Sequence, residues 1–166
     1  MLNTIKMILI STALFLVVGC GFHFQHGELI PSQLKRLHLE SQDTYSPIVT
    51  AMRKQLQENG VKLVEDSQTI PVLRINKTIT NDQVASIFKS GREAEKILII
   101  EVEATLKLSD QKVYPIKAAV NRTFFDNSRA ALAKSTEKEV IWHDMYEQAA
   151  RQLITKMISF NRELVK

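Results

Sequence analysis

EAEKILIIEVEATLKL, residues 93–108, is the stretch that decides the fold, because apolar and polar residues alternate along most of its length. The alternation runs through Val102, Ala104, Leu106 and Leu108, and a period of two predicts a β-strand with one buried face. The continuous apolar run 97–100 predicts that this strand is central in its sheet and covered on both faces there. The fold is therefore expected to be a sheet built around this strand.

Two further strands are predicted beside it. Residues 72–79 alternate and the pattern continues more weakly to Phe88, before a turn at 89–92. On the other side, Ser109-Asp110 turns the chain into a strand over 113–125. Because Pro115 cannot donate a ladder hydrogen bond, we expect this last strand to be an edge strand or to be bulged at that point.

Helical patterns flank the strands. A half-buried strand is predicted over 35–40, and Ser46-Pro47 predicts the start of a helix that ends at Asn59-Gly60, before a short strand over 61–64. Residues 126–134 leave the sheet, and Thr136-x-x-Glu139 fits a capping box for a second helix reaching about residue 160. This order predicts an α+β two-layer sandwich, with two helices on one face of a mostly four-stranded sheet.

The N-terminus predicts a signal peptide. Lys6 precedes the apolar run 7–18, which as a helix rises only about 18 Å and is too short for a bilayer core of about 30 Å. We therefore expect three parts: residues 1–19 as a lipoprotein signal peptide, 20–33 as a lipidated N-terminus and tether, and 34–166 as a single α+β domain.

Cys20, the one cysteine of the chain, directly follows the apolar run. The sequence Val17-Val18-Gly19-Cys20 resembles a bacterial lipobox, which implies cleavage before Cys20 and covalent N-acyl and S-diacylglycerol lipid on it. Several acyl chains anchor a protein firmly to a membrane. By analogy, Gly21 in place of Asp favours the periplasmic side of the outer membrane. The alternative is a buried thiol beside an apolar segment.

Composition and motifs argue against several classes of function. A net charge of +4, dispersed along the chain, does not predict nucleic-acid binding. His23, His26, His38 and His143 lack metal-ligand spacing, so no metal site is expected. No phosphate-binding loop or nucleophile elbow occurs, and Glu139 is better explained as a capping residue. The chain is therefore predicted not to be an enzyme and to need no dissociable cofactor.

Taken together, six motifs in chain order resemble the LPS-assembly lipoprotein (LptE) family, where LPS is lipopolysaccharide. They are CGFH at 20–23, ASIFKSG at 85–91, YPI at 114–116, FFDN at 124–127, ALAK at 131–134 and MYEQAARQLI at 145–154. The resemblance implies a two-helix, four-stranded domain that plugs the β-barrel LptD, helps that barrel to assemble and binds LPS during its export to the cell surface.

Basic residues at two places could bind the anionic, phosphorylated lipid A of LPS. Lys89 and Arg92 flank the predicted turn, while Arg129 and Lys134 follow the last strand. If the long strands form hairpins, both places lie at the same end of the sheet. The resemblance implies LPS binding for Lys89 and Lys134, and the alternative is that each is a solvated surface charge.

Three functions remain open at this point: a barrel-assembly partner, an LPS-binding module and an envelope enzyme. The first two are compatible with each other. A further alternative is a general envelope lipoprotein that acts as a lipid-binding or scaffold module without a barrel partner.

Overall fold

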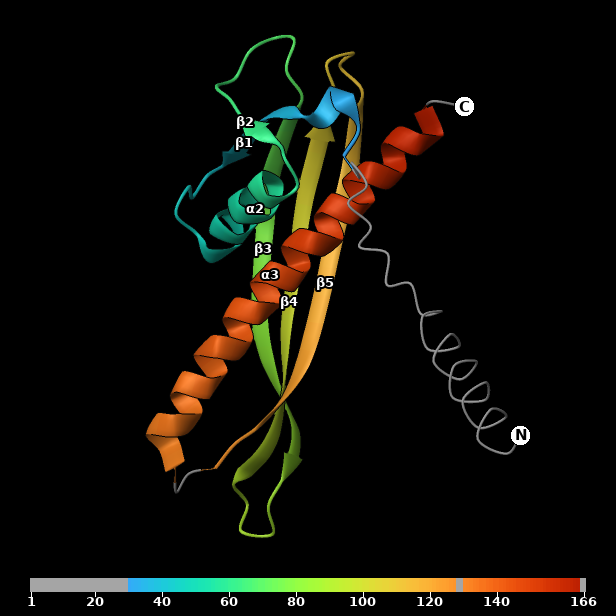
Figure 1. Ribbon diagram of the computed structural model, residues 1–166. Helices are drawn as coiled ribbons and strands as arrows, with labels where there is room; N and C mark the ends of the chain where they lie inside the picture. The colour runs from blue at the N-terminus through green and yellow to red at the C-terminus, as the bar shows by residue number, and fades with distance from the viewer. Residues whose placement is uncertain (1–29, 128–129, 165–166) are drawn as a thin grey trace, which may run out of the picture.

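The computed structural model describes residues 30–127 and 130–164, and it confirms the α+β two-layer class (Figure 1). Five strands form one sheet in the order β2-β1-β3-β4-β5, and both α2 and α3 lie on the same face of it. In chain order the elements are a 3₁₀ turn at Ser32–Leu34, β1 (Arg36–Ser41), α2 (Pro47–Glu58), β2 (Lys62–Leu63), β3 (Val72–Ile87), β4 (Glu93–Lys107), β5 (Val113–Phe125) and α3 (Ala131–Leu164).

The sheet is mixed, and β4 is its central long strand. β1 is parallel to β2 and β3, whereas β4 is antiparallel to β3 and β5. Leu98 and Ile100 are fully buried under the helices, but Ile97 and Ile99 on the other face are only half-buried. The prediction that both faces of this run are covered is therefore wrong, because both helices pack on one face.

β5 is an edge strand, as Pro115 predicted, and no bulge interrupts its pairing with β4. The outer edge is partly covered by side chains of α3. Gln152 Oε1 accepts a hydrogen bond from the Ala119 N–H at 3.3 Å, and Lys156 Nζ donates to the Lys117 carbonyl. Pro115 lies an even number of residues before Ala119, so its missing N–H would have pointed away from β4 and no ladder bond is lost.

The core lies between the helix pair and the sheet. A polar cluster joins the two helices inside it: the Glu147 carboxylate of α3 accepts hydrogen bonds from Lys54 Nζ at 2.9 Å and from Gln55 Nε2 at 2.8 Å. Glu147 is 6% exposed. The largest fully buried side chains are Leu34, Leu37, Ile48, Met52, Leu56, Leu73, Leu98, Ile100, Leu106, Ile116, Met145 and Leu153.

α2 begins at Pro47 as predicted, but Ser46 does not cap it with its side chain. The Ser46 hydroxyl donates instead to the Asp43 carbonyl at 2.9 Å. Gly60 has a φ of +77°, the left-handed conformation that commonly ends a helix.

α3 begins six residues earlier than the capping-box pattern predicts, at Ala131 instead of Glu137. Thr136 lies inside the helix, where its hydroxyl donates to the Leu132 carbonyl at 3.2 Å. Ala131, Leu132 and Ala133 favour the helical state, so the helix begins before the local capping signal. Met145 is the first buried residue of α3, and the half-buried Ile141 and Trp142 before it also pack against the core, so the part of the helix before Ile141 extends past the core.

The N-terminal part of the chain enters the core at Ile30, which is 4% exposed. The predicted signal peptide, Cys20 and most of the predicted tether lie outside the described residues. Among the helices within the described ranges, none combines the length and apolar character needed to cross a membrane.

A candidate site between the β3–β4 turn and α3

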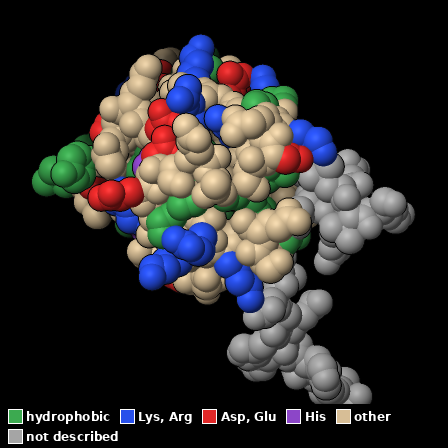
Figure 2. Space-filling model, turned by 90° about the horizontal axis from the view of Figure 1, so that it is seen from above, with side chains coloured by type: hydrophobic (Ala, Val, Ile, Leu, Met, Phe, Trp, Pro, Cys, Tyr) green, Lys and Arg blue, Asp and Glu red, His purple; other side chains and the backbone are tan. Residues whose placement is uncertain are grey.

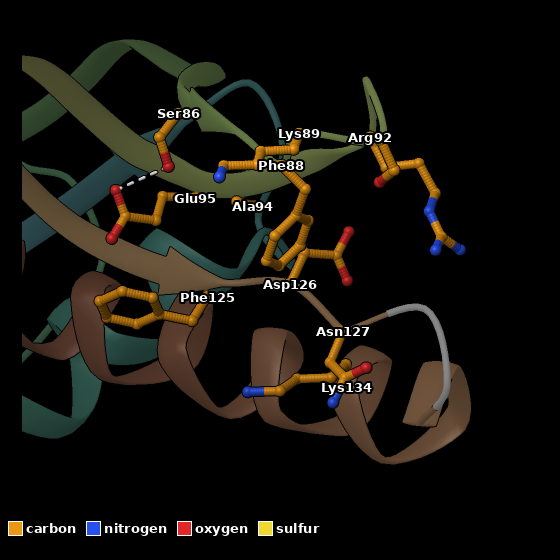
Figure 3. A pocket seen from close by; sticks show the side chains of 11 residues that line it. Ser86, Phe88, Lys89, Arg92, Ala94, Glu95, Phe125, Asp126, Asn127 and Lys134 are labelled. Carbon is orange, nitrogen blue, oxygen red and sulfur yellow. Dashed lines mark hydrogen bonds between the residues drawn. The ribbon is translucent and has the colours of Figure 1, made fainter.

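One end of the molecule holds a pocket of about 850 Å³ (Figure 3). We call this end the tip; it consists of residues 82–96, 123–127 and 130–142. The lining residues are Ser86, Phe88, Lys89, Ser90, Arg92, Ala94, Glu95, Phe125, Asp126, Asn127 and Lys134. The pocket thus combines basic, acidic and aromatic side chains from three segments of the chain.

Backbone pairing brings these segments together. In the antiparallel register of β4 and β5, Glu95 lies opposite Phe125, and the Asp126 N–H then donates to the Ala94 carbonyl at 2.9 Å. Across the turn, the Phe88 N–H donates to the Arg92 carbonyl at 2.7 Å. Gly91 adopts a φ of +78° there, a conformation that glycine accepts without strain.

Lys134 reaches the pocket from the first turn of α3 rather than from a loop. Its Nζ lies 5.5 Å from the centroid of the Phe124 ring, within the range of a cation–π contact. The same ammonium group is 2.7 Å from Glu137 Oε2, and the side chain is 23% exposed. Lys134 is therefore held in place, with part of its charge neutralised.

Lys89 and Arg92 belong to the turn between β3 and β4. Lys89 makes no hydrogen bond or ion pair with any other residue that the structure describes. Figure 3 shows Lys89 entering from the hairpin and Lys134 from the helix, with the Phe88 ring drawn between them and the Phe125 ring to one side, whereas the Arg92 guanidinium points toward the outer rim.

Two carboxylates partly neutralise the positive charge of the pocket. Glu95 Oε2 accepts a hydrogen bond from the Ser86 hydroxyl at 2.8 Å, and Asp126 is half-buried. Three cationic and two anionic side chains line the pocket, which leaves one net positive charge on its walls. An anionic group would therefore bind best on the side of Lys89 and Lys134.

Two ion pairs lie next to the pocket: one connects α3 to β3, and the other lies within β4. Lys138 Nζ lies 2.7 Å from Asp82 Oδ2, and Lys96 Nζ lies 2.6 Å from Glu93 Oε2. The hydrogen bond from Lys138 lowers the pKa of the Asp82 carboxyl, while the hydrogen bond to Glu93 raises the pKa of Lys96. Both shifts favour the charged forms of Asp82 and Lys96.

The other pockets are poorer candidates for a ligand-binding or metal-binding site. A pocket of about 300 Å³ on β1 and β3 contains Arg74, but the Arg74 guanidinium forms a two-pronged ion pair with Glu40, with both distances at 2.8 Å. Within residues 30–127 and 130–164, no group of three or more His, Cys, Asp and Glu side chains could hold a metal ion.

The structure brings three of the predicted binding residues, Lys89, Arg92 and Lys134, into this one pocket. Arg129 and Cys20 lie outside the described residues. Sequence reasoning did not identify Phe125 or Asp126 as lining residues. The β4–β5 register places them there, and the turn at 109–110 was the available signal for that register.

The fold and the pocket define a class: a small α+β domain with two helices on one sheet face and a basic pocket lined with aromatic rings. The family model described as Lipopolysaccharide-assembly matches residues 34–157. The chain belongs to the LptE family. This membership supports a role in lipopolysaccharide transport.

Curated relatives agree with the family match. The chain is 38% identical over 160 residues to the LPS-assembly lipoprotein LptE of Photorhabdus laumondii, covering 96% of this chain and 88% of the relative. It is also 38% identical over 156 residues to that of Pectobacterium atrosepticum, with 93% and 85% covered.

A solved structure has the same architecture. Rare lipoprotein B from Shewanella oneidensis superposes with a TM-score of 0.73 at 33% identity, covering 79% of this chain and 99% of that one. A minor lipoprotein from Acinetobacter baumannii, at 22% identity and a TM-score of 0.64, shares the fold.

Proposed function

We propose that the protein is an outer-membrane lipoprotein, anchored at the periplasmic side through lipid on Cys20, which plugs and helps to assemble the LptD β-barrel and binds LPS during export. The observation that carries the LPS part is the pocket at the tip. Lys89 and Lys134 enter it from the β3–β4 turn and from α3, and the Phe88 and Phe125 rings line the same pocket. Arg92 also lines the pocket. Arg129 lies outside the described residues, and its part in LPS binding stays a prediction.

The chemistry of the pocket suits a phosphorylated glycolipid. Ammonium groups bind phosphate oxygens through charge-assisted hydrogen bonds. Lys89 has no acidic partner among the described residues, so no internal ion pair there has to be broken before it binds. The role that follows is binding and assembly without catalysis.

A charge-reversal experiment tests this function. The double variant Lys89→Asp/Lys134→Asp should reduce LPS affinity by about tenfold or more, since each charged hydrogen bond contributes roughly 1.5–3 kcal/mol. The matched control is Lys62→Asp/Lys77→Asp, which changes the net charge equally at two exposed lysines outside the pocket. Equal LPS affinity for the two double variants would remove the pocket from the proposal.

Copurification tests the barrel part. The full-length lipoprotein, extracted from outer membrane in detergent, should carry a large β-barrel protein with it, and depletion of the lipoprotein should leave that barrel misassembled. Both double variants should retain the barrel, because neither removes a core residue. Intact barrel after depletion would favour the alternative of an envelope lipoprotein that acts without a barrel partner.

A further inference from the structure

Exposed apolar side chains gather at the tip. Of the nine large hydrophobic residues that are exposed in the described part of the chain, six lie at this end: Val84, Ile87, Phe88, Phe125, Leu132 and Val140. Leu132 is 87% exposed, Ile87 65% and Phe88 51%. These fractions are too high for a role in holding the core together, so the side chains are available to a ligand or partner.

The opposite end of the molecule has a different surface. Viewed from there, charged side chains of both signs and other polar surface cover most of the face, and apolar side chains show in separate patches (Figure 2). The tip therefore differs from the rest of the surface in combining apolar side chains with the basic pocket residues Lys89, Arg92 and Lys134.

We propose that the apolar side chains of the tip bind the acyl chains of the glycolipid whose phosphate the pocket would bind; this inference rests on the proposed function. Phosphate and acyl groups of such a lipid are attached to the same sugars, a few bonds apart. A phosphate bound by Lys89 and Lys134 would place the acyl chains near the Phe88 and Phe125 rings, which line the same pocket.

Charge complementarity selects this occupant over others. A neutral apolar partner would gain nothing from the cations that stand among the apolar groups, and a second copy of the chain would bring its own cations against them. An anionic amphiphile matches both halves of the surface. The tip would then recognise the phosphorylated and acylated end of LPS rather than its outer saccharide.

The test compares two forms of one ligand on the full-length lipoprotein. Rough LPS and the same LPS after complete chemical deacylation both carry phosphate, but only the first carries acyl chains. The unmodified protein should bind the acylated form about tenfold or more tightly than the deacylated form. Val84→Ser/Ile87→Ser, at two exposed tip residues that do not line the pocket, should lose about tenfold in affinity for acylated LPS and keep its affinity for the deacylated form.

One control and one further tip variant make the result specific. Tyr45→Ser removes a side chain that is 91% exposed in the β1–α2 loop, away from the tip, and should leave both affinities unchanged (Figure 1). Leu132→Ser removes a side chain of the tip that has little contact with the rest of the fold. It should lower the affinity for acylated LPS even if the double variant were to fold poorly.

The outcomes separate this inference from the proposed function. The acyl-chain inference is wrong if the unmodified protein binds both ligand forms with equal affinity. It is also wrong if the tip variants bind acylated LPS as tightly as the unmodified protein does. Neither result would argue against phosphate binding in the basic pocket. If the tip variants lose the barrel but keep LPS, the apolar surface contacts a protein wall and the inference is also wrong. Undiminished binding of both forms by Lys89→Asp/Lys134→Asp would instead remove the proposed phosphate site.

Discussion

Lys138 of α3 donates a hydrogen bond to Asp82 of β3, with 2.7 Å between Nζ and Oδ2. This ion pair spans the two layers beyond the core, where α3 has no buried side chain before Met145. Together with the contact of Lys134 on the Phe124 ring, it holds the first turns of α3 over the sheet and so fixes one wall of the pocket.

Lys138→Ala should loosen that part of the helix without unfolding the domain. Because the pair is partly exposed, we expect the free energy of unfolding to fall by less than about 1 kcal/mol. Amide hydrogen exchange in residues 131–141 should become a few-fold faster, roughly as expected for a local opening. Lys112→Ala, which removes an exposed ion pair with Asp110 at the other end of the sheet, is the control and should leave this exchange unchanged.

Two leucines of α3 provide a matched test of where the core lies. Leu153 is fully buried and Leu132 is 87% exposed. Leu153→Ala should cost about 2–5 kcal/mol of unfolding free energy, because it leaves a cavity, whereas Leu132→Ala should change it by less than about 0.5 kcal/mol. Denaturant unfolding of the two variants measures the difference, and similar costs would contradict the placement of α3.

Glu147 joins the helices through a buried hydrogen-bonded cluster. Glu147→Ala leaves Lys54 without its partner and removes one acceptor of Gln55, so we expect a loss of about 1–3 kcal/mol in unfolding free energy. Lys54→Ala should have a smaller effect on the unfolding free energy, because the Lys54 side chain is 54% exposed. A larger loss of unfolding free energy for Lys54→Ala than for Glu147→Ala would contradict the central role of the buried carboxylate.

The same cluster predicts a dependence of stability on pH. Burial raises the pKa of the Glu147 carboxyl, but hydrogen bonds from Lys54 and Gln55 and the charge of Lys54 outweigh it, so the net pKa lies below its ordinary value. The unfolded chain then binds this proton at higher pH than the folded one, since an unperturbed Glu has a pKa of about 4.3. The stabilisation is complete above that value and is lost as pH falls through the folded pKa.

Unfolding of the unmodified protein and Glu147→Gln at several pH values measures this effect. The difference between their unfolding free energies should be largest at neutral pH and should shrink below about pH 5. Asp82 also has a lowered pKa, but it is present in both proteins and its contribution cancels. A difference that stays constant down to pH 3.5 would contradict the role given to the charged carboxylate.

Sequence periodicity predicted β4 and β5 clearly because one face of each is buried over much of its length. Val102, Ala104 and Leu106 alternate in β4, and the structure buries all three. The second half of β3 was harder, since its register shifts at Val84–Ser86 and again at Ser86–Ile87 interrupt the alternation. The start of α3 was placed too late, because a local capping pattern carries less free energy than a run of strong helix formers.

The candidate site was predictable only in part. Hairpin geometry alone brings Lys89 and Lys134 to one end of the sheet. The aromatic wall formed by Phe125 was not predictable, because a shift of one residue in the β4–β5 register would move that ring to the other face. A single sequence does not determine the register closely enough.

The tip is built on parts of β3 and α3 that contribute no buried residue: none is buried in 77–92 or in 130–144 of the described chain. Outside Ile141 and Trp142, which are half-buried and pack against the core, substitutions there change what the pocket contacts and remove no packing from the core. Binding preference and folding stability can therefore change independently during evolution. Lineages that alter the phosphate or acyl pattern of their surface glycolipid should show their sequence differences at this end, while the residues beneath the helices stay the same.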